Sequence, residues 1–351
     1  MKIFRKKIGF IFIAVMLLIS LGIFGWGCGR KHADTEAPSV AESEANLEKD
    51  KGILSIDGEA AKAEDEKQPD PIDGGKSDQA DKGKVNPAHT SENGESVSES
   101  PVIIKEDYSR YFDGINGCAV FYNSRANTFH IYQEEMASVR VSPCSTFKVI
   151  STLIGLEEGL VDSEESRMGY DGTIYENTTW NQDLNLKEAF QKSCVWYYRK
   201  LLDQVGEEKV KKWVDALDYG NCDISQWKGD GSVNGGAEEL NGFWLESSLE
   251  ISAREQTEVL ARIFDGNTEF QEKYVSMLRD MMKTEDEDTC GIEIYGKTGT
   301  GQNGNHADAW YVGMTVDGEE TNYFAVRLAA AKESRITGAD AKNIALRIIH
   351  K

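Results

Sequence analysis

The sequence lacks aromatic side chains over a long stretch near its start. No Phe, Tyr or Trp occurs between Lys31 and Asp107. Residues 29–107 also carry 20 acidic against 10 basic side chains, which is about half of the chain's net charge of −21. A segment this polar and this charged cannot bury a core. We therefore expect residues 29–107 to form a disordered, self-repelling acidic linker. The acidic balance also argues against nucleic acid as a partner.

Long apolar runs are equally scarce, and the sequence shows one clear example, Ile8–Phe24. It follows four basic residues and precedes a short run of small residues that ends at Cys28. This order is typical of an export signal, so we expect residues 1–28 to be a signal peptide or membrane anchor. The small residues before Cys28 resemble a bacterial lipoprotein cleavage site, whereas the length of the run also permits an uncleaved anchor. Both alternatives predict an exported domain tethered to the outer face of the cell membrane.

The cysteines show no spacing that would indicate a metal site. No Cys-x-x-Cys pair occurs, and the five histidines are not clustered, so zinc is not expected. With Cys28 set aside, an odd number of cysteines remains, and the sequence does not decide their disulfide state. We expect small buried hydrophobic residues at Cys118, Cys144, Cys194, Cys222 and Cys290.

The remaining chain, residues 108–351, alternates between two kinds of hydrophobic pattern. A β-rich hairpin is predicted at 117–122 and 128–132, and a second group of strands at 292–297, 309–314 and 323–328. Helices are predicted between these groups at 145–159, 184–206, 207–217, 252–263 and 272–283, and at the end at 339–349. Two strands before the helical block and three after it indicate one antiparallel sheet built from both ends of the domain, with helices on its faces. The predicted fold class is α+β.

The first candidate for chemistry is a serine followed by a lysine at the start of a helical pattern. Ser145 and Lys148 are three residues apart and would share one helix face. A serine needs a neighbouring base, and a lysine is one only when apolar surroundings lower its pKa. The same spacing recurs at Ser225 and Lys228, but a glycine-rich run follows there, so we expect Lys228 to be a surface charge.

Three further elements lie downstream of this pair. Lys297-Thr298-Gly299-Thr300 lies at the end of a predicted strand, where a cation beside hydroxyl groups suits a carboxylate. Ser193-Cys194-Val195 lies on a predicted helix, and Trp244 lies where a loop passes into a helix and can wall an apolar cavity.

The order of these motifs is the signature of penicillin-recognising serine proteins. Over most of residues 108–351 the chain resembles the class D serine β-lactamases. The matching segments are Ser145-Thr146-Phe147-Lys148, Trp180-Asn181-Gln182-Asp183, Ser193-Cys194-Val195, Tyr219-Gly220-Asn221, Phe243-Trp244-Leu245-Glu246 and Lys297-Thr298-Gly299. The resemblance implies a β-lactamase domain that hydrolyses penicillins at least.

The resemblance also implies roles for individual residues. Ser145 would attack the lactam carbonyl, and Lys148 would be an N6-carboxylysine formed from carbon dioxide or bicarbonate. Trp244 would donate its indole N–H to that group, and Ser193 would relay a proton to the leaving nitrogen. Backbone N–H groups of Ser145 and Thr300 would form an oxyanion hole. No other cofactor and no metal is implied.

The cation that would bind the substrate carboxylate is less clearly marked. Arg335 is our candidate, with Lys342 and Arg327 as alternatives in the same region. Tyr219-Gly220-Asn221 is interpreted mainly as a helix-ending turn. Cys144 could replace Ser145 as nucleophile, but no histidine lies where a base would be expected.

Two other functions share the acylating serine. A cell-wall transpeptidase would pass the acyl group to an amine, and a β-lactam sensor domain would stay acylated. Both commonly carry asparagine at the position of Val195, so this residue favours hydrolysis. The oligomeric state and the acceptance of other β-lactams are not determined by the sequence.

Overall fold

The computed structural model describes residues 100–231, 237–284, 291–303 and 305–351. The predicted leader at 1–28, nearly all of the predicted linker and Cys290 lie outside the described residues. Within the described ranges, no helix is both long and apolar enough to cross a membrane.

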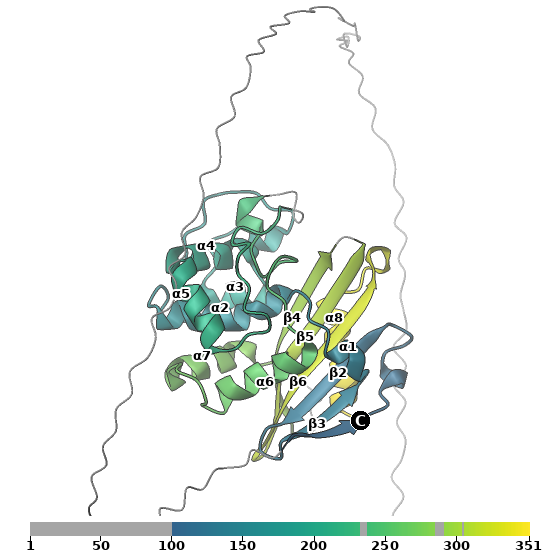
Figure 1. Cartoon of the computed structure of the whole chain (residues 1–351). Helices are drawn as coiled ribbons and strands as arrows, with labels where there is room; N and C mark the ends of the chain where they lie inside the picture. The colour runs from purple at the N-terminus through teal and green to yellow at the C-terminus, as the bar shows by residue number, and fades with distance from the viewer. Residues whose placement is uncertain (1–99, 232–236, 285–290, 304) are drawn as a thin grey trace, which may run out of the picture. The chain divides into compact units, whose positions relative to one another are not determined.

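The described chain is built on one six-stranded sheet with the strand order β1-β3-β2-β6-β5-β4 (Figure 1). The strands are β1 (Val102–Lys105), β2 (Gly117–Asn123), β3 (Thr128–Tyr132), β4 (Glu293–Asn303), β5 (His306–Asp317) and β6 (Glu320–Ala331). The antiparallel pairing of β2 with β6 joins the first hairpin to the last three strands, as predicted from the sequence. The predicted α+β class is thus confirmed.

The strands differ from prediction at both edges of the sheet. β1 pairs in parallel with β3, within the stretch predicted to be linker. Val102 is 55% exposed and its neighbours Ile103 and Ile104 are 38% and 39% exposed, so β1 buries little apolar surface. Such a strand is held mainly by backbone hydrogen bonds, which leave no mark on hydrophobic patterning. At the other edge, β4 pairs with β5 along its whole length, so it continues six residues beyond Lys297.

Helices cover the sheet on two faces. The longer helices are α2 (Lys148–Glu157), α4 (Val195–Val205), α5 (Glu207–Ala216), α6 (Ala253–Phe264), α7 (Glu272–Met282) and α8 (Gly338–Ile349). The short ones are α1 (Glu134–Ala137), α3 (Leu186–Gln191), η1 (Ser109–Tyr111), η2 (Cys144–Phe147), η3 (Thr178–Trp180), η5 (Glu238–Leu240) and η6 (Lys332–Ser334).

The alternation of side chains along β6 separates two cores. Phe324 and Val326 join one hydrophobic cluster with α8. Tyr323 and Ala325 join the larger cluster that contains the helical block from α2 to α7. Because successive strand residues point to opposite faces, one strand serves both layers. Figure 1 shows the helical block gathered beside the sheet, with α8 on the strands.

The predicted helix over 184–206 is instead two helices. α3 ends at Gln191 and α4 begins at Val195, so Ser193 lies in the connection and not on a helix as predicted. Ser193 has φ +52°, in the left-handed region that no continuous helix contains. The apolar positions keep a helical spacing across the break, so periodicity alone conceals it.

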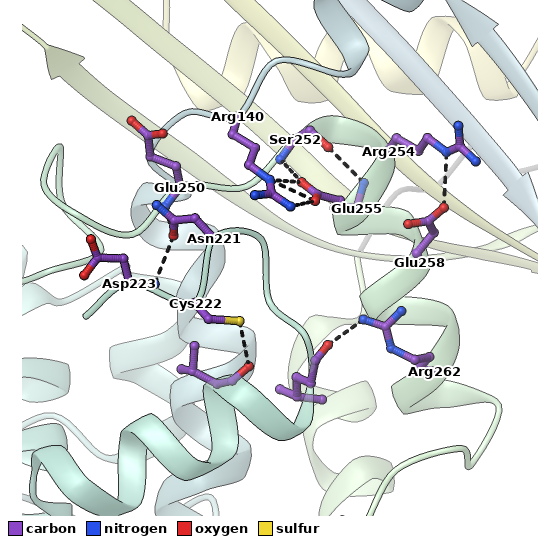
Figure 2. A network of polar contacts seen from close by, with 12 residues as sticks. Arg140, Asn221, Cys222, Asp223, Glu250, Ser252, Arg254, Glu255, Glu258 and Arg262 are labelled. Atoms are coloured by element: carbon purple, nitrogen blue, oxygen red, sulfur yellow. Dashed lines mark hydrogen bonds and ion pairs between the residues drawn. The ribbon is translucent and has the colours of Figure 1, made fainter. Parts of the chain in front are cut away.

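The start of α6 follows the sequence signal closely. Ser252 accepts from the N–H of Glu255 at 3.2 Å, and the Glu255 carboxylate accepts from the N–H of Ser252 at 2.9 Å, which is a capping box. Arg140 binds the same carboxylate, so the residue that caps the helix also ties it to the segment before η2 (Figure 2).

Candidate active site

Ser145 and Lys148 meet as predicted. Ser145 lies in η2 and Lys148 is the first residue of α2, and the lysine Nζ donates to the serine Oγ at 3.0 Å. The Lys148 side chain has no exposed surface. Burial lowers its pKa to about 8, against a small opposing effect of the thiols of Cys194 and Cys144. A large fraction of this lysine is therefore neutral near pH 8, as a base for Ser145 requires.

The segment before the serine is fixed by hydrogen bonds between side chains and backbone from distant parts of the chain. The Ser142 hydroxyl donates to the carbonyl of Trp244 and accepts the N–H of Glu246, each at 2.8 Å. The Trp310 indole donates to the Ser142 carbonyl at 3.1 Å. These bonds join the nucleophile's segment to β5 and to the loop before α6. The position of Ser145 is thus set by tertiary contacts on both sides.

Cys144 does not compete with Ser145 as the nucleophile. It is 1% exposed, and burial raises its thiol pKa to about 12. The thiolate is the reactive form, so this side chain is inert near neutral pH. Cys118 and Cys194 are also buried, as expected, and both are unpaired. Cys222 is unpaired too but only partly buried, so the prediction of a buried residue is wrong there.

A second lysine and serine face each other across the site. Lys297 donates to the Ser193 hydroxyl, and also to the carbonyl of Thr298 at 2.9 Å. Burial and the nearby charge of Lys148 hold the pKa of Lys297 well below its ordinary value. The left-handed turn at Ser193 thus aims its hydroxyl at β4. Lys297 lies within that strand, not at its end as predicted.

A cavity of about 640 Å³ opens between these elements. Its walls come from η2, the connection before α4, the loop after Trp244 and the edge strand β4. The lining residues include Ser145, Trp180, Lys192, Ser193, Val195, Leu245, Glu246, Thr298, Gly299, Thr300, Gln302 and Lys332. The predicted residues Ser145, Ser193, Val195 and 298–300 are therefore brought together around one space.

The edge strand approaches the nucleophile's segment closely at Gly299. A Cβ there would lie 3.1 Å from the Thr146 methyl and 3.2 Å from the Pro143 carbonyl oxygen. Thr300 is exposed, and its hydroxyl accepts the N–H of Gly338 at 2.8 Å. α8 thus holds the part of β4 that lines the cavity.

Trp244 is buried beside the segment that contains Ser145. Its ring stacks on Phe147 with centroids 6.2 Å apart and meets the edge of Phe243 at 5.1 Å. Its indole N–H is buried and has no hydrogen-bond partner among the described residues. A buried donor without a partner is costly, so this N–H is suited to a group that the protein chain alone does not supply.

The cations near the cavity differ from those predicted. Lys332 and Lys192 contribute to the lining, whereas Arg335 is exposed at the end of η6 and is not among the lining residues. Arg327 is buried and paired with Asp308, with Nε and Oδ1 2.8 Å apart. Lys342 lies on α8. Lys332 was not predicted from the sequence as a site residue because it lies in no recognisable motif.

Two other predictions concern residues outside the cavity wall. The Asn221 amide donates to the carbonyl of Ser248 at 2.8 Å and accepts the N–H of Glu250 at 3.0 Å, so the Tyr219-Gly220-Asn221 turn is architectural. The Lys228 side chain is 50% exposed, as expected for the second serine–lysine pair. Spacing alone did not distinguish the two pairs, but burial does.

A serine hydroxyl bonded to a buried lysine, opposite a lysine–serine pair at the edge strand of the sheet in an α+β fold, defines the penicillin-recognising class of serine proteins. The comparisons with known proteins give the family. Residues 114–350 match the model of the penicillin binding protein transpeptidase domain, and the chain belongs to that family, in its class D serine β-lactamase-like branch.

Relatives of two kinds share this domain. The regulatory protein BlaR1 of Bacillus licheniformis is 34% identical over 249 residues, which are 70% of this chain and 39% of BlaR1. The chain thus matches well under half the length of that relative. The probable β-lactamase YbxI of Bacillus subtilis is 33% identical over 71% of this chain and 85% of its own. The solved class D β-lactamase BAT-2 superposes with a TM-score of 0.60 at 30% identity, over 70% of this chain and 94% of its own.

Proposed function

We propose that this protein hydrolyses β-lactam antibiotics, penicillins at least, through an acyl-enzyme on Ser145. The observation that carries the proposal is the 3.0 Å contact between Ser145 Oγ and a fully buried Lys148 whose pKa is lowered to about 8. A serine beside a neutral amine can lose its proton as it attacks a carbonyl carbon.

We further propose that Lys148 is carboxylated by carbon dioxide. Two observations support this modification. The lysine is buried and its pKa is low enough to leave a neutral amine, the form that reacts with carbon dioxide. The buried N–H of Trp244 lacks a partner among the described residues and would suit an anionic acceptor. When present, the modification supplies a carboxylate that can serve as general base in both half-reactions.

The other residues take roles that follow from their places. Ser145 attacks the lactam carbonyl carbon and the carbon–nitrogen bond breaks, with the serine proton passing to the leaving nitrogen. Ser193 is proposed to deliver that proton, and its bond with Lys297 supports this role. Backbone N–H groups of Ser145 and Thr300 are proposed to hold the developing oxyanion, and removal of one such donor costs about 3–4 kcal/mol in other enzymes.

The substrate carboxylate needs a cationic or hydroxyl partner at the far end of the cavity. Lys297, Thr298 and Gly299 remain the proposed binding strand. Lys332 joins Arg335 as a candidate cation, because Lys332 contributes to the cavity wall. Val195 is 6% exposed and contributes an apolar side chain to the cavity wall, so it remains a proposed substrate-binding residue.

Sensing of β-lactams without turnover is the second candidate. The similarity to BlaR1, a regulatory protein, favours it. A transpeptidase is the third, suggested by the name of the matching family. All three functions begin with acylation of Ser145, and they differ in whether water then removes the acyl group.

A chromogenic penicillin distinguishes these candidates. We expect purified protein to release many equivalents of product, to work faster in bicarbonate, and to lose turnover in Lys148→Ala. Lys228→Ala removes the exposed lysine of the second pair and should turn over normally. Release of a single equivalent, at any bicarbonate concentration, would contradict hydrolysis and favour a sensor or transpeptidase.

We also propose export and attachment to the outer face of the cell membrane, through the apolar run before Cys28 or a lipid on that cysteine. The basic residues before the run and the small residues before Cys28 support this proposal.

A further inference from the structure

Behind the indole of Trp244 lies a buried cation that the proposed mechanism does not use. Arg199, on α4, is 2% exposed. Its guanidinium carbon lies 5.3 Å from the centre of the Trp244 ring system and 4.6 Å from that of Trp227. Cations are attracted to the face of an indole, and a planar guanidinium can stack on it. Arg199 therefore contacts two tryptophans, one of them the proposed partner of Lys148.

The guanidinium is fixed in this place by its other bonds. Nε and Nη2 donate to the two carboxylate oxygens of Asp203 at 3.1 and 2.5 Å, a bidentate pairing. Nη1 donates to the carbonyl of Trp227 at 2.7 Å, and the Trp227 indole donates to Asp203 at 3.0 Å. Bidentate pairing gives a fixed orientation as well as energy. The plane of the guanidinium is thus set before it meets Trp244.

The remaining sides of Trp244 are also closed. Phe147 stacks on it, Phe243 meets it edge-on, and a Cβ at Gly242 would overlap the indole ring. The indole is therefore held in one position, and only its N–H is left without a partner among the described residues. Removing Arg199 would remove the cationic contact of this enclosure.

Charge adds to this positioning effect. A cation against the ring draws electron density from it and makes the N–H a stronger donor to an anion. An anion formed on Lys148 would gain more from this stronger donor than the neutral amine would.

We propose that Arg199 is a positioning residue that sets the affinity of Lys148 for carbon dioxide, by holding and polarising the Trp244 indole. This inference rests on the proposed carboxylation of Lys148 and is independent of whether the acyl group is later hydrolysed. The expected consequence of Arg199→Gln is a weaker carbon dioxide affinity with a site that is otherwise intact.

The test is a titration of the protein with carbon-13 bicarbonate, followed by the carbamate signal in carbon-13 NMR. We expect half-saturation of this signal to need about tenfold more bicarbonate in Arg199→Gln than in the wild-type protein. This shift corresponds to a loss of about 1.4 kcal/mol in the free energy of carbon dioxide binding. Acylation of Arg199→Gln by a penicillin should recover at high bicarbonate.

A matched control is available on the same helix. Lys200→Gln removes one positive charge from the neighbouring position, whose Nζ binds the carbonyl of Gly169 at 2.9 Å. The bicarbonate titration of Lys200→Gln should match that of the wild-type protein. If Arg199→Gln unfolds, Arg199→Lys keeps the charge without the planar fork and should give an intermediate shift.

The outcomes separate this inference from the proposed hydrolysis. If the Arg199 variants and the wild-type protein reach half of the maximal carbamate signal at the same bicarbonate concentration, the inference is overturned. If the wild-type protein shows no carbamate signal, both this inference and the proposed carboxylation are overturned. A normal carbamate signal with a single turnover would remove hydrolysis alone, and a shifted titration in Arg199→Gln would then still support the role of Arg199.

Discussion

At the scale of single residues, the cavity contains an acid that the motifs did not mark as functional. Glu246 follows Leu245 in the loop before α6 and has φ +53°. One of its carboxylate oxygens is buried without a hydrogen-bond partner among the described residues. A Cβ at Gly301 would overlap both this side chain and the thiol of Cys144. The carboxyl group is thus enclosed between the nucleophile's segment and β4.

This environment gives Glu246 an unusual titration. Burial, and secondarily the charge of Asp308 on β5, raise its pKa to about 8, with Asp230 acting in the same direction and Lys332 on η6 opposing. In the unfolded chain the pKa returns to its ordinary value of 4.5. Between these values the folded state holds a proton that the unfolded state has lost, so the free energy of unfolding falls as pH rises.

We therefore predict that Glu246→Gln flattens the pH dependence of stability. Between about pH 5 and 8 the wild-type protein should therefore lose more stability, or gain less, than the variant, because the lowered pKa of Lys297 acts in the opposite direction in both proteins. Urea unfolding at pH 5, 6.5 and 8 measures both slopes. Glu239→Gln changes another glutamate, in the 3-10 helix before this loop, and should keep the original slope. If the free energy of unfolding changes with pH equally in Glu246→Gln and in the wild-type protein, the Glu246 carboxyl is already ionised at pH 7 and the prediction is wrong.

At the scale of elements, local signals at helix ends proved reliable. The capping box of Ser252 and Glu255 was predicted from the sequence and is present at α6. Gly206, predicted to stop a helix, has φ +91° between α4 and α5. These signals act over three or four residues, so the sequence contains all that they need.

The cap at Ser252 leads to a prediction about stability. Ser252→Ala removes the acceptor for the Glu255 N–H and should lower the free energy of unfolding by about 1 kcal/mol. Chemical denaturation monitored by circular dichroism measures this change. Ser247→Ala, five residues earlier, removes a hydroxyl bonded to Gln226 in an exposed region and should cost less than about 0.5 kcal/mol. Equal costs for the two variants would contradict a capping role for Ser252.

The predictions of helices and strands were wrong where long-range contacts override the local sequence pattern. The break between α3 and α4 places Ser193 against Lys297, 104 residues away. β1 exists because β3 offers it a hydrogen-bonding edge, although its own side chains remain exposed. Neither the break between α3 and α4 nor the strand β1 changes the hydrophobic periodicity from which helices and strands are predicted.

At the scale of the whole molecule, the site lies between the sheet and the helical block. η2 and α2 supply Ser145 and Lys148, and β4 supplies the opposite wall. The two sides come from segments far apart in the sequence, and the pairing of β2 with β6 joins the first hairpin to the last three strands of the sheet. The geometry of the candidate site therefore depends on segments from across the described domain.

The remaining prediction concerns the tether. Activity should sediment with membranes when the full chain is expressed, because the N-terminal run carries the features of an export signal. If a lipid on Cys28 is the main anchor, Cys28→Ala should move most activity to the soluble fraction, and Cys222→Ala should not. A Cys28→Ala protein that stays fully with membranes would instead indicate an uncleaved apolar anchor.

The sequence by itself determined the fold class, most element positions and the identity of the serine–lysine pair, because these depend on periodicity, capping and motif order. Tertiary structure decided which chemistry those residues can perform. Burial, not spacing, distinguishes Lys148 from Lys228 by lowering the pKa of the former. Packing of distant side chains placed Arg199 on Trp244 and enclosed Glu246 beside Gly301. Desolvation and contacts across a hundred residues are properties of the folded chain, and no local pattern contains them.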